Sequence, residues 1–246
     1  LTAKDANDVT IDVSKATGSS GAFKLVGGTG KDTLTGGAGA DIITGGDDID
    51  TIDGGAANDI ITGGAGNDII TGGDGNDSIT IDTDTDKIND LGGSTGNDQD
   101  VVVVKAGATL NAINIIGFTA TNSTQNKSTG ASNAVLNAKD GENVTIDVSK
   151  ATGAFKLVGG TGQDTLTGAG GADTITGGGE ADTIVGNAGI DTIDGGTGND
   201  IITGGDGADI ITIASGTDKV TDLGGSSGTD KDVVVINGSA ILNAVD

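Results

Sequence analysis

The sequence predicts an all-β protein built from two tandem parallel β-rolls with flanking β-strand segments. Three observations support this fold class: a nine-residue repeat that alternates turn and strand residues, a duplication of the whole pattern, and an unusual composition. The 246 residues include 48 glycines, and only 1% are aromatic. A core of large side chains is therefore excluded, so Ile, Val and Leu must form a thin one. Stacked repeats bury such a core because each unit covers its neighbour.

The larger repeat is a duplication. The segment VTIDVSKATG at 9–18 returns at 144–153, and TDKI at 85–88 returns as TDKV at 217–220. Each TDK motif is followed by DLGGS and then by a valine-rich run. The sequence therefore holds almost two copies of one module. Its start at Leu1, without an initiator Met, leads us to expect an excerpt from a longer protein.

The smaller repeat has a period of nine residues and fills two blocks, 27–80 and 159–212. The first six residues of each copy are rich in glycine, which allows the positive φ values of a tight turn. The last three predict a short strand whose central residue, always Leu or Ile, points inward. Two nonapeptides complete one coil, so alternate repeats belong to opposite parallel sheets. The twelve copies begin at Gly27, Gly36, Gly45, Gly54, Gly63, Gly72, Gly159, Gly168, Gly177, Gly186, Gly195 and Gly204.

Strand-like segments flank both blocks. The alternating segment VTIDV at 9–13 predicts a strand that leads into the first roll. The runs Val101–Val104 and Val233–Ile236 predict buried strands that cap the rolls. The Thr-, Asn- and Ser-rich stretch 117–135 predicts an exposed connector. The expected organisation is 1–26 leading strands, 27–80 first roll, 81–112 capping strands, 113–138 connector, 139–158 leading strands, 159–212 second roll and 213–246 capping strands.

Position six of the nonapeptide is Asp in all twelve copies. In a coil of two nonapeptides, Asp residues two repeats apart lie roughly 4.7–4.9 Å apart along the stack. Stacked carboxylates repel, so we expect a divalent hard cation between them. Calcium accepts about six to eight oxygens, which carboxylates and loop carbonyls together can supply. The predicted metal ligands are Asp32, Asp41, Asp50, Asp59, Asp68, Asp77, Asp164, Asp173, Asp182, Asp191, Asp200 and Asp209.

The expected bridging pairs are separated by two repeats. In the first block they are Asp32 with Asp50, Asp41 with Asp59, Asp50 with Asp68, and Asp59 with Asp77. In the second block they are Asp164 with Asp182, Asp173 with Asp191, Asp182 with Asp200, and Asp191 with Asp209. The chain would then bind about eight or more calcium ions.

A second group of acidic residues follows each block. Asp86 and Asp90 in the first copy correspond to Asp218 and Asp222 in the second, and these four are added to the predicted calcium ligands. Further on, Asp98 and Asp100 correspond to Asp230 and Asp232. One interpretation is a capping site that closes the open end of the roll with a final calcium ion. The alternative is an acidic turn without a ligand.

The repeats GGTGKDTLT at 27–35 and GGAGNDIIT at 63–71 resemble the GGxGxDxUx nonapeptide of the RTX (repeats in toxin) family. That resemblance implies calcium-bound parallel β-rolls in a bacterial protein exported by type I secretion, with the secretion machinery as a partner. Several repeats depart from the pattern, and we expect distorted or weaker sites there. The departures are Asp48, Ala57 and Glu180 at position four, and Ala169 and Asn187 at position two.

Composition excludes several function classes. The chain contains no His and no Cys, which removes imidazole bases, thiol nucleophiles and zinc–thiolate sites. Its formal net charge of −24 argues against nucleic acid and against anionic membranes, both of which are bound through basic residues. No apolar run approaches the roughly 20 residues of a membrane-spanning helix. We therefore expect neither a nucleic-acid partner nor direct insertion into a membrane.

Two functions fit these observations. The first is a structural module of a secreted, extracellular bacterial surface protein, of the S-layer or adhesin type, which becomes rigid on binding calcium and contacts other copies or modules of that protein. The second is the folding and export region of a secreted enzyme or toxin whose catalytic domain lies outside this sequence. The duplicated module favours the first, so we expect this chain not to be an enzyme.

Overall fold

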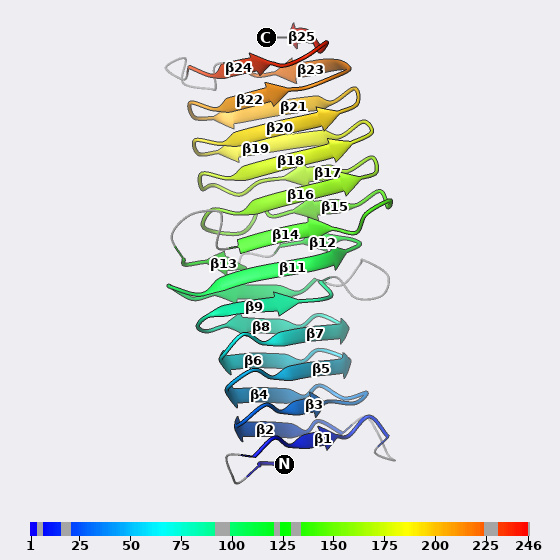
Figure 1. Cartoon of the computed structure of the whole chain (residues 1–246), viewed down its shortest axis with the longest axis vertical. Helices are drawn as coiled ribbons and strands as arrows, with labels where there is room; N and C mark the ends of the chain where they lie inside the picture. The colour runs from blue at the N-terminus through cyan, green and yellow to red at the C-terminus, as the bar shows by residue number, and fades with distance from the viewer. Residues whose placement is uncertain are drawn as a thin grey trace.

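The computed structural model describes residues 1–3, 7–15, 21–91, 99–120, 124–128, 134–223 and 231–245. These residues form 25 strands in one elongated stack of coils, with the N-terminus at one end and the C-terminus at the other (Figure 1). Every strand pair is parallel, from β1 with β3 at one end to β23 with β25 at the other. The all-β parallel roll predicted from the nonapeptide is confirmed. No described segment is a helix long and apolar enough to span a membrane.

The strands belong to three sheets. The twelve-stranded sheet contains, in spatial order, β1 (Thr10–Asp12), β3 (Thr33–Thr35), β5 (Thr51–Ala56), β7 (Ile69–Asp74), β9 (Thr85–Ile88), β11 (Thr109–Ile115), β14 (Ala134–Ala138), β16 (Lys156–Thr161), β18 (Thr174–Gly179), β20 (Thr192–Thr197), β22 (Ile210–Ile213) and β24 (Val233–Ile236).

Two shorter sheets form the opposite side of the stack. The six-stranded sheet contains β13 (Gln125–Asn126), β10 (Val101–Val104), β8 (Ser78–Ile81), β6 (Ile60–Ala65), β4 (Ile42–Asp47) and β2 (Lys24–Thr29). The seven-stranded sheet contains β12 (Phe118–Thr119), β15 (Thr145–Asp147), β17 (Thr165–Thr167), β19 (Thr183–Ala188), β21 (Ile201–Asp206), β23 (Thr217–Thr221) and β25 (Ile241–Val245).

Alternate nonapeptides lie in opposite sheets, as the period of nine predicts. β3, β5 and β7 belong to the twelve-stranded sheet, whereas β4, β6 and β8 belong to the six-stranded one. Residues in neighbouring strands pair at a separation of 18, for example Ile43 with Ile61 and Ile52 with Ile70. This register stacks identical repeat positions along the axis. A side chain at one position therefore has the same neighbours in coil after coil.

The core is a single layer of aliphatic side chains between the sheets. All twelve Leu and Ile residues at position eight are at most 1% exposed. Burying one such side chain stabilises a fold by about 1.5–3 kcal/mol, so this layer is the main apolar contribution to the roll. Threonine and glycine cannot add comparable apolar area. The stability of the fold consequently depends on the interactions of its loop residues as well as on its core.

The two modules share one continuous sheet instead of being joined by an exposed connector. β11 pairs with β14, and β14 pairs with β16, so the twelve-stranded sheet runs through the junction. Phe118 is 1% exposed and Ala134 is fully buried, although both lie in the stretch 117–135 that we expected to be exposed. Polar composition misled the prediction because these apolar residues alternate with Thr and Asn. The domain boundaries stay predictions.

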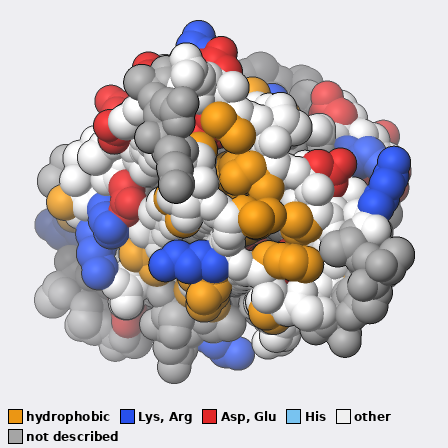
Figure 2. Space-filling view, turned by 90° about the horizontal axis from the view of Figure 1, so that it is seen from below, with side chains coloured by type: hydrophobic (Ala, Val, Ile, Leu, Met, Phe, Trp, Pro, Cys, Tyr) orange, Lys and Arg blue, Asp and Glu red, His pale blue; other side chains and the backbone are white. Residues whose placement is uncertain are grey.

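The two predicted capping strands differ in their burial. Val101–Val104 forms a strand in which Val102 and Val104 are buried, as predicted, because β13 lies beside it. The prediction of burial is wrong for Val233–Ile236: this strand is formed, but Ile236 is 53% exposed. The reason is that β24 is the edge of its sheet in the described chain. At the other end, hydrophobic side chains gather on the N-terminal face (Figure 2).

Candidate metal centre

The position-six Asp side chains point into the roll, where they bond to the neighbouring coil. The Asp50 Oδ1 atom accepts a hydrogen bond of 2.8 Å from the backbone N–H of Asp32, and Asp68 Oδ1 accepts one of 2.8 Å from Asp50. Each of these carboxylates is at most 2% exposed. From the third repeat of each module onward, the strand register places each position-six Asp beside its counterpart 18 residues earlier. The carboxylates thus form continuous columns, which we call carboxylate ladders.

There are four carboxylate ladders in the described chain, two in each module. They are Asp32, Asp50, Asp68 and Asp86; Asp41, Asp59, Asp77 and Asp100; Asp164, Asp182, Asp200 and Asp218; and Asp173, Asp191, Asp209 and Asp232. The first member of each ladder accepts from the N–H of a leading-segment residue, namely Val9, Phe23, Val144 or Phe155. The ladders therefore tie the leading and capping segments to the repeats.

The second carboxylate oxygen is the chemically unusual feature. Oδ2 is buried with no hydrogen-bond partner in many ladder members. A buried polar atom without a partner costs about 1–3 kcal/mol, and more when it is charged. The atom needs either a cation or a proton. The residues concerned are Asp32, Asp50, Asp59, Asp68, Asp86, Asp164, Asp182, Asp191, Asp200, Asp218 and Asp232.

Glycine at position one leaves room for this oxygen. A Cβ atom on Gly45 would lie 2.3 Å from Asp50 Oδ2 and 2.5 Å from the carbonyl oxygen of Gly63. The same carboxylate and carbonyl oxygens converge beside Gly27 and Gly177. Sequence reasoning assigned these glycines to turn formation, but position one does not have a left-handed φ. Its glycine is required by space, because any side chain would displace the carboxylate.

The donor set of the loops fits calcium. Only oxygen atoms are offered, and hard cations such as Ca²⁺ prefer oxygen ligands. In the part of the chain that the structure describes, no three acidic side chains converge on one point. A bound ion would accordingly be held by a ladder Asp, such as Asp50, together with backbone carbonyls of the glycine-rich loops. Calcium would supply the positive charge that the unpartnered Oδ2 atoms lack.

Burial raises the pKa of the ladder carboxylates. Loss of hydration is the largest cause, the backbone N–H donor lowers the pKa, and for most of these groups neighbouring carboxylates raise it further. The pKa of Asp50, Asp86, Asp182 and Asp191 rises from 3.8 to about 7. The pKa of Asp59, Asp173 and Asp200 rises to about 6. Without a cation, the ionised ladders therefore oppose folding near neutral pH.

This leads to a prediction for the calcium-free chain. A carboxyl pKa that is higher in the folded state than in the unfolded state means that the folded state binds more protons. Stability should therefore increase as the pH falls from 8 toward 5, through the raised pKa values of 6 to 7. The strand signal in circular dichroism, recorded from pH 8 to pH 5 on protein freed of metal by a chelating resin, checks this and should grow as the pH falls. A strand signal that decreases as the pH falls over this range would contradict it.

The prediction has an internal control. At saturating calcium, protons compete with the ion for the same carboxylates, so acidification should no longer stabilise the fold. The two pH profiles should consequently have opposite slopes between pH 5 and 8.

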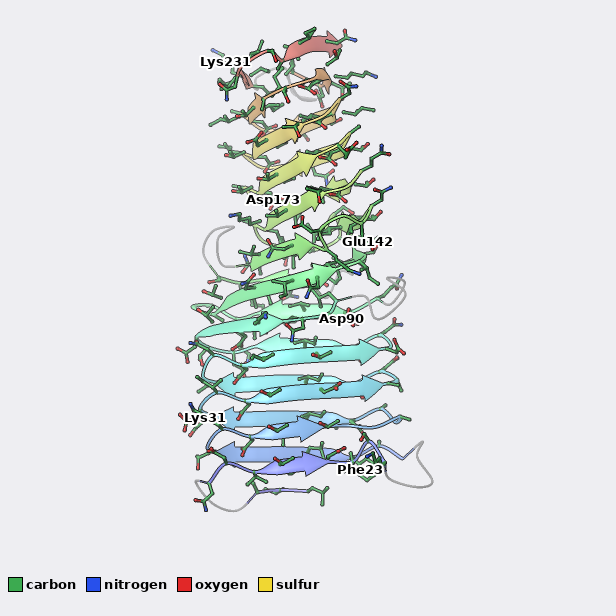
Figure 3. The ribbon with its side chains drawn as sticks, turned by 45° about the vertical axis from the view of Figure 1, so that its right-hand side comes forward. Phe23, Lys31, Asp90, Glu142, Asp173 and Lys231 are labelled. Carbon is green, nitrogen blue, oxygen red and sulfur yellow. The ribbon has the colours of Figure 1, made fainter. Side chains whose placement is uncertain are left out.

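The structure sorts the acidic residues of the capping segments. Asp86 and Asp218 belong to carboxylate ladders and are fully buried, and their role as calcium ligands stays a prediction. Asp90 and Asp222 do not: each follows the end of its strand, is only partly buried, and lies outside the ladders. Figure 3 shows Asp90 near the junction of the modules. The role of both residues in calcium binding stays a prediction.

Sequence reasoning missed the last members of two ladders. Asp100 accepts from Asp77 N–H, and Asp232 accepts from Asp209 N–H, both at a separation of 23 residues instead of 18. The sequence contains a signal for both residues. Each stands two positions before an apolar residue of a valine-rich strand, just as the position-six Asp stands two positions before the Leu or Ile of a nonapeptide. We did not recognise this signal because five additional residues interrupt the 18-residue spacing. The correspondents Asp98 and Asp230 lie outside the described residues.

Most departures from the nonapeptide pattern retain the glycine backbone conformation. Asp48, Ala57 and Glu180 at position four have φ values of 69°, 77° and 69°, and Asn187 at position two has 74°. A non-glycine residue in this left-handed region costs roughly 1–2 kcal/mol. These loops therefore keep their shape at a local energetic cost. Ala169 is different, because its φ is not left-handed.

These features define a class of protein: a parallel β-roll whose loops carry buried carboxylate columns suited to a divalent cation. Comparison with family models agrees. The model of the RTX calcium-binding nonapeptide repeat matches the chain four times, at residues 17–52, 44–79, 156–184 and 185–220, together more than half of its length. The chain belongs to the RTX calcium-binding nonapeptide repeat family. No curated protein matches the sequence.

Proposed function

We propose that this chain is a structural module of a secreted bacterial surface protein, of the S-layer or adhesin type, that folds and stiffens when it meets extracellular calcium after type I secretion. The calcium-binding part of this proposal follows from the family to which the chain belongs. The surface role goes further and rests on how the modules are joined.

The continuous twelve-stranded sheet carries the proposal. Backbone hydrogen bonds cross the junction from β9 through β11 and β14 to β16. The buried side chains of Phe118, Leu136 and Phe155 belong to the same core cluster as the repeats. Two domains on a flexible linker would move independently, whereas strands of one sheet move together. Two modules therefore form one rod, which suits a stalk or lattice component (Figure 1).

The composition supports a structural role over a catalytic one. The described carboxylates that are most buried already accept backbone hydrogen bonds in the ladders, and the chain has neither His nor Cys to act as a base or nucleophile. Calcium held on those carboxylates would further prevent them from exchanging protons. We therefore propose that the chain binds calcium and has a structural role, not a catalytic one.

The location of the protein distinguishes this proposal from the alternative, in which the chain is the export region of a secreted enzyme. Antibodies raised against the chain should label intact, unpermeabilised cells of the source organism in a continuous layer or on projecting fibres, viewed by electron microscopy with calcium present. Washing with a chelator should remove or disorder the label. Finding the chain only in the culture medium, on a polypeptide with hydrolytic activity, would overturn the surface role.

A further inference from the structure

The second loop of each module, residues 36–41 and 168–173, differs from the other ten repeat loops. We infer that these two loops close without calcium, and that Asp41 and Asp173 are not calcium ligands although they match the nonapeptide pattern. The inference rests on the calcium-dependent folding proposed above and divides the twelve repeats into two kinds.

The first difference is the partner of the inner oxygen. Asp41 Oδ2 accepts a hydrogen bond of 2.9 Å from the backbone N–H of Gly37, and Asp173 Oδ2 accepts one of 2.6 Å from Ala169. Each Oδ1 also accepts a backbone bond, from Phe23 in one module and from Phe155 in the other. Both oxygens of these carboxylates are therefore satisfied by the chain itself. The corresponding Oδ2 atoms of Asp50 and Asp182 have no such donor.

The second difference is the backbone of the loop. Position two is left-handed in the other ten loops, with φ values from 74° at Asn187 to 131° at Gly46, but not at Gly37 or Ala169. The preceding strands β3 and β17 also stop after three residues, whereas β4 and β19 continue into the loop for three residues more. The second loops thus turn inward early. This early turn brings the N–H of position two to the carboxylate.

The identity of the residue at position two does not cause this difference. Position two is Gly in the first module and Ala in the second, yet both loops adopt the same conformation. In each module the second loop is the first nonapeptide loop on its side of the roll. The residue 18 positions before its Asp is Phe23 or Phe155, which belongs to a leading segment and not to a repeat. Each second-loop carboxylate is therefore bonded to a leading segment through Oδ1 and to its own loop through Oδ2.

Carboxylates with two backbone donors have no electrostatic need for an ion. A cation entering there would have to displace an existing hydrogen bond, whereas at Asp50 or Asp182 it would fill an unmet demand. The second loops would then provide a preformed first turn on that side of the roll. The later loops would add to it as calcium binds.

Counting bound ions tests the inference. The double variant Asp41→Asn with Asp173→Asn changes only the inner position, because an Asn side chain can still accept the bond from Phe23 or Phe155. The matched control is Asp50→Asn with Asp182→Asn, in the third loop of each module, where the side chains are at most 1% exposed as well. Isothermal titration calorimetry with calcium gives the number of ions per chain, and native mass spectrometry provides an independent count.

We expect the second-loop variant to bind as many ions as the unchanged chain and to melt at a lower temperature in saturating calcium, because the bond to Gly37 or Ala169 is lost. The control should lose at least one ion per module. If the second-loop variant loses as many ions as the control, the inference is overturned. An unchanged chain that takes up no calcium would instead contradict the proposed function.

The single variants Asp41→Asn and Asp173→Asn keep the test decisive if the double variant does not fold. Each leaves the other module unaltered, so its ion count is compared with that of Asp50→Asn or Asp182→Asn in the same module. A loss of ions in a single second-loop variant, equal to that of its matched control, overturns the inference as well. Retention of the full count supports it.

Discussion

Chelation of calcium is expected to remove most of the strand signal of this chain in circular dichroism. The folded state buries at least eleven carboxylate oxygens without a partner, and only a thin aliphatic layer opposes that cost. One site held at 100 times its dissociation constant stabilises a fold by about 2.7 kcal/mol. Several such sites add up to the roughly 5–15 kcal/mol that keeps an ordinary domain folded. Calcium should therefore decide between folded and unfolded chain.

The measurement is a calcium titration of metal-free protein at pH 7.5, followed by far-ultraviolet circular dichroism and by melting. We expect the strand signal to appear with calcium and to disappear again with a chelator. Magnesium at the same concentration is the control, since it demands near-octahedral geometry and releases its waters reluctantly, and it should fold the chain poorly. A chelated chain with full strand signal and unchanged melting temperature would refute the calcium dependence.

The second large effect is expected from Gly46→Ala. Gly46 has a φ of 131°, and a Cβ atom there would lie 1.9 Å from the carbonyl oxygen of Gly28 in the neighbouring coil. Both contacting atoms belong to backbones that the sheet register holds, so neither can move without breaking strand pairs. Backbone strain and overpacking together should cost about 3 kcal/mol or more.

Urea unfolding at saturating calcium measures this cost through the shift of the midpoint. Gly170→Ala is the matched control, because Gly170 lies in a repeat loop, has no heavy atom within 4 Å of the added Cβ, and does not have a left-handed φ. That variant should unfold at nearly the midpoint of the unchanged chain. Equal midpoints for the two variants would show that close backbone approach does not limit the roll.

Periodic features were predictable because each coil contacts mainly its neighbours. An Asp at position six and a Leu or Ile at position eight recur every nine residues, so the local pattern already implies one buried column of each kind. The parallel sheets, the alternation of repeats between them and the inward Ile and Leu follow from that period. The stacking of Asp32 with Asp50 likewise needs only the register.

Features at the boundaries of the period were less accessible. Asp100 and Asp232 join their ladders across longer spacings, and most of Val233–Ile236 is exposed although Val102 and Val104 of the duplicate strand are buried. The polar composition of 117–135 predicted an exposed segment, yet Phe118 lies in the core. In each case the outcome depends on which strand reaches the edge of a sheet. That is a question of contacts between segments far apart in the chain.

The nonapeptide alone specifies the roll, its thin core and the oxygen ligands of its loops. The reason is that every coil has the same residue types at the same positions and therefore packs in the same way. Three things depended on tertiary contacts: that the modules form one rod, that the ladders extend into the flanking segments, and that the Oδ2 atoms of Asp41 and Asp173 are satisfied within their own loops. Identical motifs acquire different partners where the stack begins, joins or ends, because a hydrogen bond there requires a neighbour that the motif does not encode.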